Sequence, residues 1–67
     1  MKNTKDMLEK LVDENRLSRI IGNLEDISYE KADHLRSNWQ DENTAKIWDK
    51  ASVILANTQN KLKELGL

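Results

Sequence analysis

Apolar residues recur along the chain at intervals of three and four, the spacing that places them on one face of an α-helix. In the second half these steps run without a miss through Thr44, Trp48, Ala51, Leu55, Thr58, Leu62 and Leu65. The first half carries a similar stripe from Met7 to Trp39, which Asn15 and Arg16 interrupt. The pattern predicts two amphipathic helices, over residues 4–38 and 43–65.

Polar residues separate the two stripes, and we expect the chain to reverse direction there, over residues 39–42. Ser, Asn and Asp side chains compete for backbone hydrogen bonds, and Asp41 or Asn43 is a suitable cap for the second helix. The only tryptophans, Trp39 and Trp48, lie on either side of the break. Folding the chain back would bring both indoles into one cluster near the bend, either as core or as part of a surface that a partner reads.

A chain of 67 residues forms one domain, here residues 1–67, and buries only about 60% of the surface that its unfolded form exposes. It has no Cys, so no disulfide can support so thin a core, and association with another chain is the simplest remaining support. We therefore predict an all-α fold, a two-helix antiparallel hairpin that associates into a four-helix bundle. The residues expected at its core and partner interface are Leu17, Ile21, Leu24, Leu35, Trp39, Trp48, Ala51, Leu55 and Leu62.

Gly22 falls in the middle of the first predicted helix, where glycine costs about 1 kcal/mol relative to alanine. It marks either a tolerated surface position or a place where a second helix crosses closely.

Charge and hydropathy narrow the range of partners. The net charge is −1 with acidic and basic residues intermixed, so no basic face suggests nucleic acid. The longest apolar run, residues 53–56, is far too short to cross a bilayer, and the charged start of the chain lacks the apolar core of a signal peptide. We expect a cytoplasmic protein, or one exported by a route that needs no signal peptide.

Few residues suggest chemistry. His34 lies one helical turn after Glu30, but two ligands from one chain do not complete a metal site, and a lone exposed histidine is the ordinary interpretation. Neighbouring carboxylates on a helix point in different directions, and two helices offer no pocket of ordinary ligand size. We expect no catalysis, no metal and no cofactor.

The corner resembles the Trp-x-Gly (WxG) family of small bacterial proteins exported by type VII secretion. The resemblance rests on Leu35, on Trp39 before a small polar break, and on a second amphipathic helix that opens with Ala45. Asp41 stands where the family has Gly, and Ile47 stands near its aromatic position. The resemblance implies a helical hairpin that pairs as a homodimer or heterodimer, either as a secreted substrate or as an accessory partner of a larger secreted toxin.

Tyr29 and Asp33 match the Tyr-x-x-x-Asp/Glu pattern that is part of the type VII export signal. In the family this pattern follows the second helix, whereas here it lies in the first, and the same spacing is frequent by chance in helices. The alternative to the secretion hypothesis is a cytosolic structural or regulatory oligomer, from a phage or a bacterium, that binds another protein or, less in keeping with its charge, nucleic acid.

Overall fold

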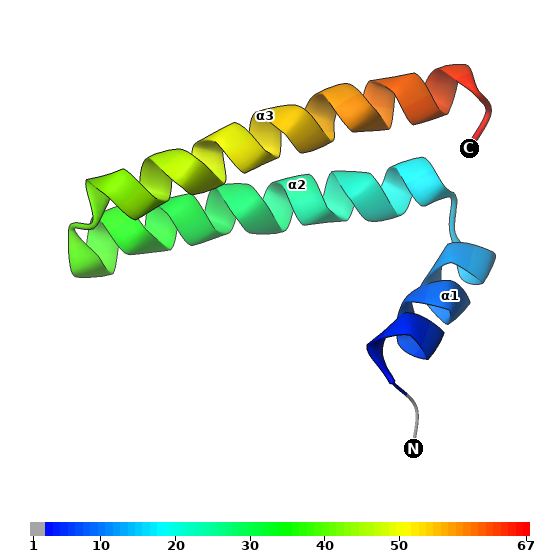
Figure 1. The fold of residues 1–67 in the computed structure, drawn as a ribbon, viewed down its shortest axis with the longest axis horizontal. Helices are drawn as coiled ribbons and strands as arrows, with labels where there is room; N and C mark the ends of the chain where they lie inside the picture. Colours follow the sequence, from blue (N-terminus) through cyan, green and yellow to red (C-terminus); the bar gives the residue numbers. More distant parts are fainter. Residues whose placement is uncertain (1–2) are drawn as a thin grey trace.

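The computed structural model describes residues 3–67, so the first two residues of the predicted 1–67 domain lie outside it. Within this range the chain is all-α and has no β-strand. Its elements are α1 (Thr4–Glu14), α2 (Leu17–His34), a short π-helical turn η1 (Leu35–Trp39) and α3 (Glu42–Glu64) (Figure 1). No helix in the described part is long and apolar enough to cross a membrane.

The prediction of one continuous helix over residues 4–38 is wrong, because the chain breaks at Asn15 and Arg16, the two residues that interrupt the apolar stripe. Both residues are extended, with φ −135° and ψ 166° at Asn15 and φ −73° and ψ 145° at Arg16. The Asn15 amide Nδ2 donates to the Leu11 carbonyl oxygen at 3.0 Å and so occupies a helix-terminal acceptor. Residues 3–67 therefore form three α-helices instead of two.

α2 and α3 run antiparallel and lie side by side along their length. The turn η1 ends at Gln40, whose positive φ of 52° reverses the chain. Asp41 then caps α3 by accepting a hydrogen bond from the Thr44 N–H at 3.1 Å. α3 begins and ends within one residue of the predicted 43–65, and Gly66, at φ 83°, terminates it as a left-handed cap.

Small residues line the contact between α2 and α3. The side chains that become buried are Ser18, Ser28 and Ala32 on α2 and Ala45 on α3. Such residues let two helices approach closely but remove little apolar area from water. At the open end of the pair, the Ser18 N–H donates to the Leu67 carbonyl oxygen at 3.1 Å.

Gly22 lies at this close crossing, against the Gln59 side chain of α3. A Cβ at position 22 would collide with the terminal amide of Gln59. The three nearest atoms all belong to the movable end of the Gln59 side chain, so α3 meets position 22 through a flexible group and not through a contact that requires glycine.

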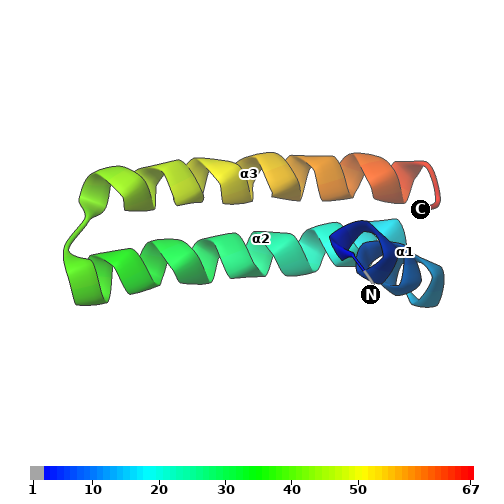
Figure 2. The same cartoon turned by 60° about the horizontal axis from the view of Figure 1, so that its bottom comes forward.

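The whole arrangement is one helix thick. Its principal extents are 38 × 35 × 12 Å, and a helix with its side chains measures about 10–12 Å across. α1 meets the start of α2 at a steep angle and lies within the same layer, as Figures 1 and 2 show together. The radius of gyration is 14.0 Å, whereas a compact chain of this length has about 11 Å.

We predict that Gly22→Ala stabilises the chain by about 0.5–1 kcal/mol, because helix propensity favours Ala and the Gln59 amide is the movable end of a flexible side chain. The measurement is urea unfolding followed by circular dichroism. Gln59→Ala is the matched control: the gain from Gly22→Ala should be at least as large in that background. A loss of stability in both backgrounds would mean that backbone packing, and not the amide, limits position 22.

Candidate partner interface

An ion-pair network identifies one face of the α2/α3 pair. Ala32 and Ala45 lie at the centre of the contact, being 1% and 0% exposed. Arg36 and Asp49 each follow these alanines by four residues, and the Arg36 Nη2 donates to Asp49 Oδ2. On both helices, the residue four positions after a buried contact residue therefore faces one side of the pair. The residue three positions after it faces the opposite side.

The opposite face is apolar. Leu35 follows Ala32 by three residues and Trp48 follows Ala45 by three, and this relation repeats every seven residues. The series gives Ile21 and Leu35 on α2, with Ser28 buried between them at the edge of the contact, and Trp48, Leu55 and Leu62 on α3. Leu24 and Ala51 extend the face outwards, and no helix of the described residues 3–67 lies over it. We call this surface the apolar face.

Eight of the nine predicted interface residues belong to the apolar face or its margin. The structure leaves seven of them half-buried, namely Leu17, Ile21, Leu35, Trp48, Ala51, Leu55 and Leu62. Leu24 is 40% exposed. Further out, Ile27 on α2 and Ile47 and Ile54 on α3 are exposed, the last two at 66% and 64%. A single chain therefore covers this face only partly.

Trp39 departs from the expected tryptophan cluster. It lies at the end of η1 and is 70% exposed, while Trp48 on α3 is half-buried. The π-helical turn widens the backbone and ends in the left-handed Gln40, so the chain turns away before the Trp39 indole reaches the contact between α2 and α3. Of the two interpretations of the tryptophans, a core that buries both indoles is wrong for the single chain, whereas a surface that a partner contacts stays a prediction.

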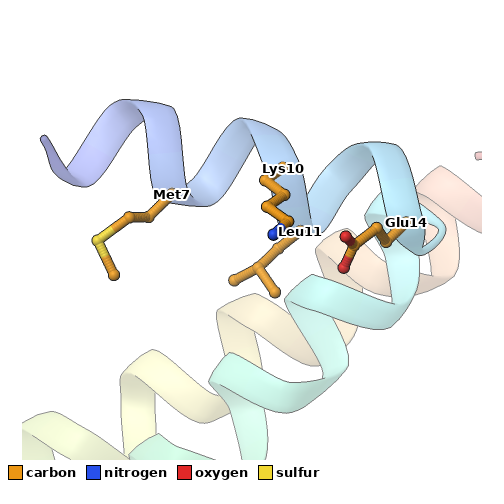
Figure 3. Close-up of a pocket in the computed structure, with 4 residues that line it drawn as sticks. All are labelled: Met7, Lys10, Leu11 and Glu14. Atoms are coloured by element: carbon orange, nitrogen blue, oxygen red, sulfur yellow. The ribbon is translucent and has the colours of Figure 1, made fainter. Parts of the chain in front are cut away.

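α1 carries a second apolar surface, made by Met7, Leu8 and Leu11, and none of its residues is buried. Met7 and Leu11 point into the open space between α1 and α2, with Lys10 and Glu14 beside them (Figure 3). Sequence reasoning placed these residues on one long helix and so missed that they form a separate surface. The interruption at Asn15 and Arg16 was the available signal.

The remaining candidates do not converge. Tyr29 and Asp33 are both exposed on α2, and Tyr29 lies on the side of the ion pair. The His34 Nδ1 lies 2.8 Å from the Asn38 Nδ2, so a side-chain amide occupies that nitrogen. Among residues 3–67 there is no group of three His, Cys, Asp or Glu side chains that could hold a metal ion.

Arg36 joins the two sides of the corner. Its Nε donates to both carboxylate oxygens of Glu42, at 3.0 and 3.1 Å, while its Nη2 donates to Asp49. The hydrogen bond from Arg36 holds the pKa of the Asp49 carboxyl below its usual range, and both carboxylates raise the pKa of the guanidinium. This network also escaped sequence reasoning, since only the reversal of the chain brings Arg36 and Asp49 together.

Comparison of the chain with protein-family models, with curated proteins and with solved structures gave no match.

We predict that part of the stability is lost as the pH falls below about 4, the ordinary range of an unfolded Asp. The Asp49 pKa is lower in the folded chain than in the unfolded chain, so its contribution is fully present above that range and disappears as the folded carboxyl becomes protonated. The measurement is the urea midpoint at pH 7 and at pH 3 for the wild type and for Asp49→Asn, which should show the smaller change.

Arg36→Gln is the matched control, because it removes the other partner of the same contact. It should reduce the pH dependence as Asp49→Asn does, and the double variant should add little to either. An Asp49→Asn variant with the full wild-type pH dependence would rule out this contact as the cause.

Proposed function

We propose that this chain is a protein–protein interaction module whose α2/α3 pair associates through its apolar face with another helical pair, from a second copy or a similar protein, to form a four-helix bundle. Domains are stable when at least two layers of secondary structure enclose a core between them. A second pair of helices is the layer that this chain lacks.

The observation that carries the proposal is the excess of exposed surface. The chain exposes 5548 Å², whereas a compact monomer of 7.8 kDa exposes about 4,400 Å². The excess is about 1,200 Å² per chain, so two such chains covering it would bury about 2,400 Å² in total, which is the range of permanent complexes. Part of that surface consists of exposed apolar residues on α2 and α3. Their removal from water would contribute most of the favourable free energy of association.

The resemblance to the Trp-x-Gly family supplies a biological setting for this proposal. In that setting the chain is a small type VII substrate, or an accessory protein that pairs with a larger secreted toxin. The support is the pattern of Leu35, Trp39 and Ala45 around the corner, together with the exposure of Trp39, since tryptophan is enriched in the parts of interfaces that contribute most to affinity.

Sedimentation equilibrium of the purified chain from 1 to 100 μM, paired with thermal unfolding, tests the interaction module. If the partner is a second copy, we expect association at these concentrations. If the partner is a different protein, we expect a single-chain mass and a broad unfolding transition that sharpens when the partner is added. A single-chain mass with sharp, cooperative unfolding at 1 μM would contradict the proposal, because it would mean that the single layer is sufficient.

We predict that Ala51→Glu weakens association at least tenfold, about 1.4 kcal/mol, because it places a carboxylate on the apolar face. Ala51 is half-buried and small, so this substitution removes almost no existing packing. The measurement is the dissociation constant from sedimentation.

Val53→Glu is the matched control, two residues along the same helix. Val53 is exposed on the side away from the apolar face, so its variant should associate like the wild type and keep the same helical content. Equal effects of the two substitutions would indicate that the added charge, and not the apolar face, governs association.

A further inference from the structure

α1 turns back toward α2 but does not pack along it. It has 11 residues and no buried side chain, and isolated helices of fewer than about 12–15 residues are marginal in water. Met7 and Leu11 point toward α2 across open space and are 58% and 44% exposed (Figure 3). A helix this short needs an apolar surface on which to lie, and α2 of the same chain is the surface that it already faces.

α2 carries an apolar stripe that matches α1. Counting outwards from the bond between Asn15 and Arg16, α1 has Leu11, Met7 and Thr4, and α2 has Ile20, Leu24 and Ile27 at the same distances. Both series run in steps of four and three, so each lies on one side of its helix. When two helices fold back on each other across a short connection, residues at equal distances from it meet, which pairs Leu11 with Ile20 and Met7 with Leu24.

The α2 stripe lies beside the apolar face and not at its centre. Ile20 follows the buried Ser18 by two residues, a rotation of about 200° that places it round the side of α2 away from α3. Leu24 is the member that the stripe shares with the margin of the apolar face. A helix on this stripe therefore covers Leu24 but leaves Leu35 and Trp48 open to a partner.

The connection makes the same chain the docking site for α1. Asn15 and Arg16 alone separate the two helices, and so short a link holds α1 beside its own α2 at an effective concentration on the order of millimolar. A second copy at micromolar concentration cannot compete with that. Both residues are extended, and no side-chain hydrogen bond caps the start of α2, so changes in their backbone angles swing α1 without unwinding either helix.

We propose that α1 is a hinged arm that swings about the 15–16 connection and closes antiparallel onto the apolar stripe of its own α2. Leu11 then packs against Ile20, and Met7 packs against Leu24. α1 is about 16 Å long against about 27 Å for α2, so the corner end of α2 stays uncovered. This proposal does not depend on the proposed function, because the closed arm lies beside the apolar face and not over it.

Disulfide formation within one chain tests the closure, since the sequence has no Cys. We predict that the Met7→Cys, Leu24→Cys chain forms its internal disulfide at least ten times faster than the Glu9→Cys, Leu24→Cys chain. Glu9 lies two residues from Met7, a rotation of about 200° that places it away from the stripe, and the two pairs close loops of similar length. The measurement is the rate of thiol loss in dilute protein, with non-reducing gel electrophoresis to separate single chains from linked dimers.

Two outcomes would overturn the closure. Equal rates for the two chains would mean that α1 has no preferred side toward α2. Linked dimers as the main product of the Met7→Cys, Leu24→Cys chain in dilute solution would mean that α1 docks on a second chain instead.

Amide hydrogen exchange provides a second measurement that needs no added Cys. Leu11→Asp should speed exchange in α1 at least tenfold, whereas the lower helix propensity of Asp alone would account for about threefold. Val12→Asp is the matched control, because Val12 lies one residue along α1, about 100° round the helix and off the stripe. Equal acceleration by the two substitutions would contradict the closure.

Discussion

The constraint on which the rest of the structure depends is that the helices lie in a single layer. A helix pair can bury only the narrow strip along which its two members meet, and a molecule 12 Å thick has no second surface against which to pack the rest. Every large apolar side chain of α2 and α3 consequently lies beside the contact and not inside it. The half-buried state of Trp48, Leu55 and Leu62 is the direct result.

The residues at the contact further limit the apolar area that α2 and α3 bury against each other. Ser18, Ser28, Ala32 and Ala45 bring the backbones of α2 and α3 close together, but they provide little of the apolar burial that stabilises a folded chain. The Ser28 hydroxyl is satisfied within its own helix, donating to the Leu24 carbonyl oxygen at 2.9 Å, so it adds no bond between the helices. Polar contacts at the two ends of the pair, from Arg36 to Glu42 and Asp49 and from Ser18 to Leu67, set its register. Register and close approach thus come from small and polar residues, while the larger apolar side chains of α2 and α3 stay partly exposed.

Sequence reasoning succeeded where one local signal acts alone. The limits of α3 follow from an uninterrupted stripe, the Asp41 cap and Gly66, and all three appear in the structure close to where they were expected. It failed at Asn15 and Arg16, where an apolar stripe on both sides favoured a continuous helix and a side-chain hydrogen bond to Leu11 favoured its end. It also failed at Trp39, because periodicity does not reveal a π-helical turn that changes the direction of one side chain. The positions of the apolar-face residues could be predicted, but the side of the pair occupied by the charged network depends on the reversal of the chain.

The corner divides two structural requirements between Gln40 and Asp41. A tight reversal after a helix needs one residue in the left-handed region, and here Gln40 takes that conformation with φ 52°. Position 41 is then free of that demand, with φ −93°, and its carboxylate caps α3 through the Thr44 N–H, a bond that glycine cannot make. The same bond holds the pKa of the Asp41 carboxyl below its usual range. The left-handed conformation thus falls on Gln40, and Arg36 links η1 to Glu42 and Asp49 across the bend.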